Sequence, residues 1–240
     1  MNLNLLTALL MTLLSLGMVI LIMFQFNKIL QRSIFKPEDR IRLFFISLIL
    51  VTGWFILIGV LSLTGVFADF SQLPPRPAFL IILPLPFVIW FSFTKTFRRL
   101  AIVTPRSWLI NIQTFRFAVE IILWLMLIAG QIPVQMTFEG NNFDILVGLT
   151  AIPFSYWCFR KGRNNVKLAV IWNIAGILLL LNILTVAILS MPTPLRYFMN
   201  EPANTIVGEF PYTYLPGVLV VIAYTMHVFS LRQLALVRKK

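Results

Sequence analysis

Long apolar runs alternate with short polar connections along the whole chain. Each run holds close to the ~20 apolar residues that a helix needs to cross the ~30 Å hydrocarbon layer of a membrane. These runs cover residues 5–26, 43–67, 78–94, 108–132, 143–159, 167–190 and 214–233. The pattern predicts an all-α fold, a polytopic membrane bundle of about seven transmembrane helices that forms a single domain over residues 1–240.

Three of these runs depart from a plain span. The first, 5–26, lacks the basic start and the small-residue cleavage site of a signal peptide, so we predict a retained helix. The third contains Pro84 and Pro86, which remove two backbone donors and should kink or unwind the helix. Carbonyl groups freed in this way need cover from protein or from a water-filled cavity. The fifth, 143–159, is short, and a re-entrant segment stays an alternative to a full span.

Composition strengthens the membrane prediction. Of the 240 residues, 59% are hydrophobic and 12% are charged. Soluble domains are roughly half apolar and one quarter charged, so a water-soluble fold has no means of hiding this many apolar side chains. The predicted spans also use most of the chain, which leaves no room for a separate soluble domain.

The distribution of charge orients the predicted bundle. The net charge is +12, and 17 of the 20 Lys and Arg residues fall in alternate connections. These connections are 27–42, 95–106, 160–167 and 232–240. The other connections carry only Arg76 and Arg196. Cytoplasmic loops of membrane proteins carry such an excess, so we predict an external N-terminus, a cytoplasmic C-terminus and no nucleic-acid partner.

The chain has few residues suited to metal binding or covalent catalysis. With one cysteine, Cys158, and one histidine, His227, a single chain cannot build a disulfide or a Cys/His zinc site. It also lacks the Gly-x-Ser-x-Gly elbow, the His-Glu-x-x-His pair and a phosphate-binding glycine loop. We therefore expect no catalytic residue, no metal and no cofactor. The absence of an Asn-x-Ser/Thr sequon favours a bacterial plasma membrane as the location.

Gln113, Arg116 and Glu120 form the most distinctive polar group, because they share one face of the predicted fourth helix. Arg116 and Glu120 have the i,i+4 spacing at which opposite charges pair. At ~1.5 Å per residue from Arg106, Glu120 lies ~21 Å along the helix, near the middle of the membrane. An ionisable group there should face the bundle interior with a partner, for which we predict Arg116. The pair is either a ligand- or proton-binding centre or a buried ion pair that fixes helix packing.

Three further polar residues lie within the predicted helices and are candidates for the same internal ligand site. They are Asn182, Tyr224 and His227. Asn182 equally suits a hydrogen bond between helices. His227 lies five residues before Arg232, and a position at the level of the lipid headgroups is the favoured interpretation.

Two outer connections carry further candidates. Glu139, Asn141 and Asp144 place oxygen ligands close together, but their spacing is not that of a calcium-binding hand. A solvated loop is favoured there, with Asn142 or Asp144 at the start of the fifth helix. The segment 191–213 is long and rich in aromatic residues, and we predict that it covers the outer end of the bundle.

Three functions fit this sequence. The favoured one is to bind or move a small molecule through a polar site inside the bundle, around Arg116 and Glu120. The alternative is a non-catalytic assembly or structural subunit that acts through partner helices, and a membrane enzyme acting on a lipid-like substrate is the third. The partners that fit are the lipid bilayer, a small-molecule ligand, and a second copy of the chain or another membrane protein. A cavity that reaches Glu120 favours the first function, and a dry ion pair favours the second.

Overall fold

The computed structural model describes residues 2–160 and 162–237, and its regular elements there are all helical. The α-helices are α1 (Leu3–Arg32), α2 (Pro37–Leu63), α3 (Arg76–Ile82), α4 (Pro84–Ser92), α5 (Lys95–Val103), α6 (Arg106–Asn111), α7 (Phe115–Ile128), α8 (Ile145–Phe159), α9 (Val166–Leu189) and α10 (Val220–Val237). The shorter turns are η1 (Val66–Ala68), η2 (Ile112–Thr114), η3 (Val134–Met136), η4 (Ile206–Gly208) and the π-helix η5 (Leu215–Leu219). The predicted all-α fold is confirmed.

Within residues 2–160 and 162–237, five helical segments are long and apolar enough to cross a membrane. They are α1, α2, Arg106–Ile128, α9 and Leu215–Leu236. A sixth is present if Arg76–Ser92 and Lys95–Val103, which meet at 78°, count as one span. Helix α8 has 15 residues, fewer than a span usually needs. These lengths and compositions fit a multi-pass membrane protein.

The third apolar run is interrupted where its prolines fall. Helix α3 ends at Ile82 and α4 begins at Pro84, because proline has no N–H to continue the hydrogen-bond ladder. Tyr224 of α10 donates a hydrogen bond to the carbonyl of Ile81 beside the break (3.3 Å). The predicted interruption is confirmed, and protein covers the backbone next to it.

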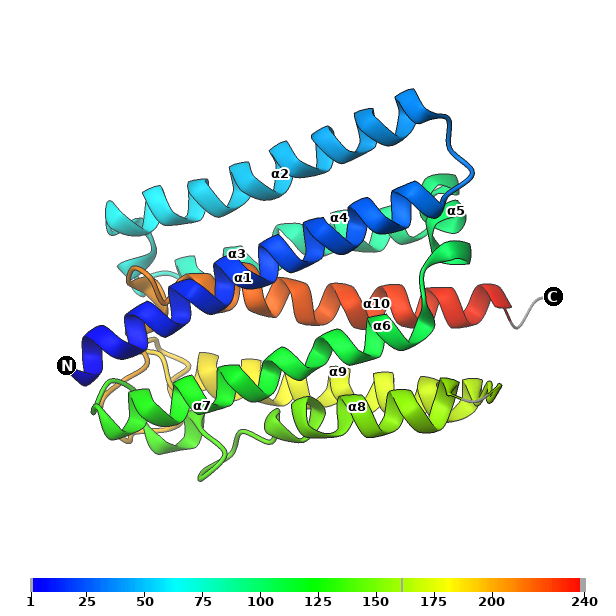
Figure 1. The fold of residues 1–240 in the computed structure, drawn as a ribbon. Helices are drawn as coiled ribbons and strands as arrows, with labels where there is room; N and C mark the ends of the chain where they lie inside the picture. Colours follow the sequence, from blue (N-terminus) through cyan, green and yellow to red (C-terminus); the bar gives the residue numbers. More distant parts are fainter. Residues whose placement is uncertain (1, 161, 238–240) are drawn as a thin grey trace.

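A sharp bend after α4 was not predicted. Thr94 caps α5 by accepting a hydrogen bond from the N–H of Phe97 (3.1 Å), so a new helix begins there instead of a loop. Helix α5 then turns across one end of the bundle (Figure 1). Its apolar side chains at Phe97, Leu100 and Ala101 are buried against the bundle.

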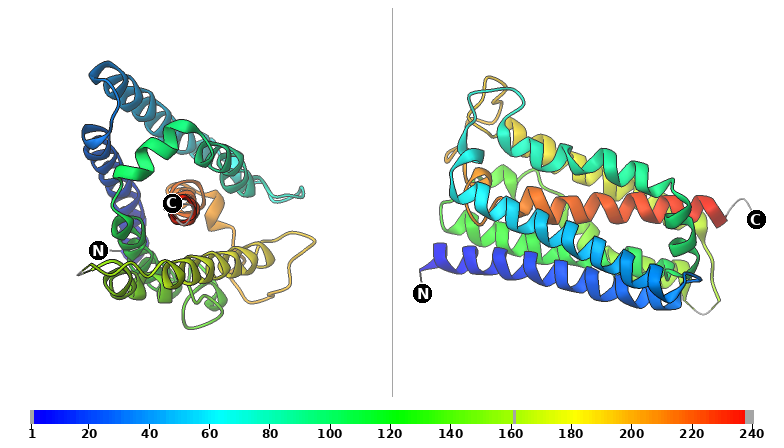
Figure 2. Two further views of the ribbon diagram at one scale, coloured as in Figure 1. Left: turned by 90° about the vertical axis from the view of Figure 1, so that its right-hand side faces the viewer. Right: turned by 90° about the horizontal axis from the view of Figure 1, so that it is seen from above.

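Helix α10 runs through the middle of the bundle, and the other helices surround it. Figure 2 (left) shows α10 end-on, with α3 and α4 on one side of it and α9 on another. Even the polar side chains of His227, Ser230 and Gln233 on α10 are therefore buried. Helix α2 lies at the periphery, where apolar side chains such as Ile49 and Leu57 are exposed. Outward-facing apolar helices around a buried centre are what a lipid environment favours.

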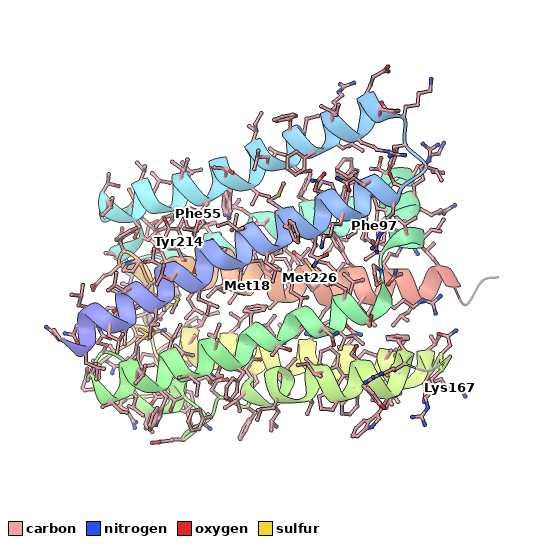
Figure 3. The ribbon with its side chains drawn as sticks, in the orientation of Figure 1. Met18, Phe55, Phe97, Lys167, Tyr214 and Met226 are labelled. Carbon is pink, nitrogen blue, oxygen red and sulfur yellow. The ribbon has the colours of Figure 1, made fainter. Side chains whose placement is uncertain are left out.

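Two contacts join the C-terminal end of α2 to the segment around the π-helix η5. Near that end, the ring of Phe55 stacks on the ring of Tyr214, with centroids 4.2 Å apart and planes at 11° (Figure 3). Trp54 Nε1 donates a hydrogen bond to the carbonyl of Gly217 (2.8 Å), within the π-helix η5. The opposite half of α2 diverges from α4 in the views of Figures 1 and 2.

The two ends of the bundle differ in charge. Connections 64–75, 129–144 and 190–214 lie at the end where α1 begins (Figure 1). The α1–α2 turn, α5 and residues 162–165 lie at the opposite end, where α10 also ends. The segments that carry most of the Lys and Arg residues therefore gather at one end, called the cationic end below.

The connection before α8 folds into the bundle. Helix α8 starts partway along the bundle and not at its end (Figure 1). Asn142 and Asp144 are buried, at 0% and 6% exposure, although Glu139 and Asn141 stay exposed. The prediction of a solvated loop is therefore wrong for Asn142 and Asp144, because these polar side chains find partners inside the bundle. Asp144 directly precedes α8, as predicted for a residue at the helix start.

The segment 190–214 packs in part on the bundle. The hydroxyl of Tyr212 lies 2.8 Å from the hydroxyl of Thr7 in α1 and accepts a hydrogen bond from Gln131 Nε2 (2.9 Å). Tyr197 and Met199 remain exposed, at 75% and 69%. The prediction that this segment covers the outer end holds for its second half only.

Candidate functional site

A buried ion pair between Arg116 and Asp144 forms the centre of the site. Arg116 lies in the first turn of α7 and is 2% exposed. Its Nε donates to Asp144 Oδ2 (2.5 Å) and its Nη2 donates to Oδ1, which is a bidentate contact. The guanidinium also approaches the carbonyl of Gly176 in α9, at 3.4 Å from Nη2. Charged groups buried in this way require such a complete set of partners.

The predicted ion pair between Arg116 and Glu120 is wrong. The structure pairs Arg116 with Asp144, which enters from the connection before α8. Neighbours at i,i+4 on one helix lie along its surface, whereas Asp144 at the start of a second helix meets the planar edge of the guanidinium with both oxygens. Tertiary packing therefore overrides the local pairing.

His227 of α10 continues the network from Arg116. Arg116 Nη1 lies 2.9 Å from His227 Nε2, and His227 Nδ1 lies 3.0 Å from Asn173 Oδ1. Because arginine has no acceptor, Nε2 must accept and Nδ1 must carry the proton that is donated to Asn173. Asn173 Nδ2 in turn donates to the hydroxyl of Ser230 (3.0 Å). The side chain of His227 is fully buried inside the bundle. The position at headgroup level favoured for it stays a prediction.

Gly176 permits this close arrangement. A Cβ atom at this position would meet the imidazole ring of His227, at 2.6 Å from Nε2. The missing side chain lets the carbonyl of Gly176 face Arg116 while α9 and α10 stay in contact. No pattern in the sequence marks this glycine, because its neighbour is 51 residues away in the chain.

Glu120 forms a second centre beside the ion pair. Its Oε1 accepts a hydrogen bond from Asn142 Nδ2 (2.7 Å), which also donates to the carbonyl of Met136 (3.0 Å). Asn142 Oδ1 accepts from the backbone N–H of Asp144 (3.0 Å), so one amide links the Glu120 carboxyl group to the backbone of the inward-folded connection. Oε2 of Glu120 is buried and has no hydrogen-bond partner in the described chain.

A cavity of about 80 Å³ reaches these side chains. Arg116, Glu120 and Asp144 form part of its wall, and the remaining wall is largely apolar. Apolar side chains of α3, α7, α9, η5 and α10 line it, and include Ile81, Val119, Ile183, Leu219 and Ala223. Since a water needs only ~10–15 Å³, the space is large enough for a small molecule. Ile81 and Ile183 are half-buried, so the cavity is not sealed from the surroundings of the bundle.

The other predicted candidates lie apart from Glu120. Gln113 is buried and donates to the carbonyl of Ala223 (2.9 Å). Asn182 donates to the carbonyl of Asn141 (2.7 Å), which suits the predicted bond between elements. Tyr224 donates its hydrogen bond to the carbonyl of Ile81, beside the break between α3 and α4. The structure thus brings together Arg116, Glu120, Asp144 and His227, and assigns helix-linking contacts to the rest.

Glu139 remains at the surface, where its Oε1 accepts a hydrogen bond from Trp124 Nε1 (2.6 Å). No group of three or more His, Cys, Asp or Glu side chains suited to a metal ion occurs among residues 2–160 and 162–237. The external loop candidates therefore separate into one buried member, Asp144, and two exposed ones, Glu139 and Asn141.

Sequence reasoning missed Asn142, Asn173 and Ser230 as members of the site. Asn173 and Ser230 lie on α9 and α10, within runs of apolar residues where a polar side chain usually faces the bundle interior. That signal was available for both residues. Asn142 had none, because an asparagine in a connection most often faces solvent or forms a turn.

Comparison with known proteins gives a family without an assigned activity. The family model described as Domain of unknown function (DUF8737) matches residues 76–235. The matched region begins with α3 and includes all the residues of the site. No curated protein and no solved structure matches the chain.

Proposed function

This chain belongs to the family of the Domain of unknown function (DUF8737), and we propose that it binds a small, largely apolar molecule in the cavity beside Glu120. One observation carries the proposal: the cavity reaches a buried carboxyl group whose Oε2 has no hydrogen-bond partner in the described chain. An unpaired polar atom in an apolar region costs free energy. A ligand that offers a donor to this atom removes that cost.

The charges of the site narrow the ligand class. Arg116 and Asp144 neutralise each other, which leaves Glu120 as the acidic group without an ion-pair partner. A ligand with an ammonium or another strong donor complements this group, whereas a carboxylate ligand meets like charge. The apolar wall then receives the rest of the molecule. The ligand is accordingly a compact apolar body that carries one donor.

In this proposal the chain crosses the membrane seven times, with α3–α4 as the third span and α8 as a short fifth span. The N-terminus is external and the cationic end of the bundle is cytoplasmic. The excess of Lys and Arg at that end supports this orientation, because cytoplasmic loops carry such an excess. The cavity then lies toward the external side, since its wall includes Met136, Met191 and Val207 from the outer connections.

A pair of probes of opposite charge tests the proposal. We expect butylammonium to raise the unfolding temperature of the protein in lipid nanodiscs, and butyrate of equal chain length to have no effect. Glu120→Gln should weaken butylammonium binding by about tenfold or more, the usual effect of losing a charged partner. Glu209→Gln, which changes an exposed carboxylate of the outer connection, is the matched control.

Equal responses to both probes, or the same loss in the Glu209→Gln control, contradict the proposal. Retained butylammonium binding in a folded Glu120→Gln protein also contradicts it, because the site would then not depend on this carboxyl group.

A second function, as an assembly subunit, is favoured by one observation on α2. Only 11% of the residues in the apolar window of α2 are buried, compared with 61% for Arg106–Ile128. An apolar helix this exposed is available to a partner helix as well as to lipid. The carboxyl group of Glu120 takes no part in assembly through α2. The Glu120→Gln variant therefore separates the two functions, because it should weaken ligand binding and leave assembly unchanged.

A further inference from the structure

A second cavity, of about 280 Å³, lies at the cationic end of the bundle. Its wall combines side chains of α1, α2, α4, α5 and α10, including Phe26, Val51, Val88, Phe97 and Met226. Figure 3 shows Phe97 toward the cationic end and Met226 nearer the middle of the bundle. The volume is near the lower limit of ordinary ligand pockets, roughly 300 Å³. The cavity shares no lining residue with the one beside Glu120.

The cavity opens sideways between α2 and α4. Leu50 on α2 and Phe87 on α4 line it and are also 57% and 53% exposed, so they mark its rim. The two helices diverge toward the cationic end, because α2 is fastened at its other end by Trp54 and Phe55. In a membrane such an opening faces lipid acyl chains.

Helix α5 closes the cavity at the cationic end and leaves one buried acceptor there. Gln233 of α10 is 3% exposed, and its Nε2 donates to the carbonyls of Ala101 (2.6 Å) and Thr104 (2.7 Å). Because both carbonyl oxygens can only accept, the amide atom of Gln233 that faces them must be the nitrogen. Oε1 of Gln233 therefore remains as an acceptor without a partner in the described chain, at a side chain that lines the cavity.

The opposite face of α5 carries three exposed cations. They are Lys95, Arg98 and Arg99. Among the described residues, the ion pairs of the structure involve none of the three. Arg40 in the neighbouring turn is instead occupied by backbone carbonyls, for example that of Phe35 (2.8 Å from Nε). The cations of α5 are thus available to an anion that is not part of the chain, at the end of an apolar cavity.

We propose that this cavity holds one acyl chain of a phospholipid whose headgroup combines an anionic phosphate with hydroxyl groups. The apolar wall receives the chain, and the cations of α5 attract the phosphate. A headgroup hydroxyl supplies the donor that Gln233 Oε1 lacks. A membrane lipid fits better than a soluble anion, because the rim at Leu50 and Phe87 lies on the lateral surface of the bundle, between α2 and α4. The site is independent of the function proposed for Glu120.

Native mass spectrometry after release from nanodiscs tests this site. The nanodiscs contain equal amounts of phosphatidylglycerol and phosphatidylcholine with identical chains. We expect one phosphatidylglycerol to be retained, preferred by about fivefold or more, since each cation near an anionic lipid contributes roughly that factor. The triple change Lys95→Gln, Arg98→Gln and Arg99→Gln should abolish the preference.

Two further variants separate the chain site from general charge. Leu50→Trp narrows the rim from an exposed position, so it should lower the retention of both lipids while the protein stays folded. The matched control removes three cations elsewhere at the same end, by Arg160→Gln, Arg163→Gln and Lys167→Gln, and should retain the preference.

Equal retention of the two lipids by the wild-type protein overturns the proposal. So does an equal loss of preference in the control variant, or unchanged retention in Leu50→Trp. Displacement of the retained lipid by soluble glycerol phosphate also overturns it, because the site would then bind a free anion. Thermal unfolding of each variant confirms that it is folded, and Leu50→Trp decides the outcome if the triple α5 variant fails to fold.

Discussion

Arg116 shows how a charged residue is accommodated deep in an apolar bundle. Its partners come from three other parts of the chain: Asp144 before α8, Gly176 in α9 and His227 in α10. Each contact satisfies a donor that would otherwise be left in an apolar environment, where an unpaired charge is costly. Arg116 thereby joins four elements, and one oxygen atom of Glu120 beside it has no hydrogen-bond partner in the described chain.

The ion pair predicts a non-additive response to mutation. Asp144→Asn or Arg116→Gln alone leaves one charge buried and uncompensated, which should lower the free energy of unfolding by ~3–5 kcal/mol. The double change Arg116→Met with Asp144→Leu should recover much of this loss. Unfolding of the variants in detergent measures the coupling. Glu120→Gln should cost less than either single change, because Asn142 retains an oxygen to which it can donate.

Additive losses in the double variant would show that the two residues do not act as a pair. A larger loss for Glu120→Gln than for Asp144→Asn would instead support the i,i+4 pairing of Arg116 with Glu120 that the sequence favoured.

At the level of elements, irregular segments make contacts that join the helices. The connection before α8 enters the bundle and supplies Asn142 and Asp144 to the site. In the outer segment 190–214, Arg196 Nη2 donates to Glu201 Oε1 (2.9 Å) and the N–H of Ala203 donates to Oε2 (2.8 Å). The connections therefore make structural contacts of their own, both with the helices and within each connection.

The turn around Glu201 should loosen at low pH. The hydrogen bond from Arg196, together with that from the Ala203 N–H, lowers the pKa of Glu201. Because the pKa is lowered, these bonds stabilise the turn fully at pH values above the ordinary glutamate pKa of about 4.3. The stabilisation is lost as the pH falls through the pKa that Glu201 has in the folded protein. Pepsin cleavage within 191–205 should then increase. In Glu201→Gln, cleavage should already be raised at the highest pH at which pepsin is active. If cleavage of this variant depends on pH as it does in the wild-type protein, protonation of Glu201 is not what loosens the turn.

At the level of the whole molecule, the separation of charge between the two ends is the dominant feature. The α1–α2 turn, α5 and residues 162–165 place most of the cations at one end. The same end contains the cavity closed by α5, whereas the Glu120 cavity lies toward the other end. The two proposed sites therefore lie toward opposite ends of the bundle.

Reporter fusions test this orientation. Fusions after residues 100, 140, 165 and 240 should report cytoplasmic, external, cytoplasmic and cytoplasmic positions, because the positive-inside rule places the cationic connections in the cytoplasm. Glu139 and Glu201 should be reachable from outside. An external C-terminus would contradict the seven-span arrangement, and an external reading after residue 165 would indicate that α8 is re-entrant.

The sequence by itself determined the helical membrane architecture and the segregation of charge. Apolar runs of membrane length leave helices as the structure that satisfies the backbone, and Pro84 locates the break in the third run wherever the neighbours lie. It also marked Arg116 and Glu120 as interior residues, since charges deep in an apolar run cannot face lipid.

Only the tertiary structure decided which groups meet. Arg116 selects Asp144 over Glu120 because α8 starts partway along the bundle, which depends on packing between distant segments and not on spacing along one helix. The burial of His227 follows from the central place of α10 and from the space left at Gly176. The two cavities likewise arise from the relative angles of helices, which the pattern of apolar and polar positions does not encode.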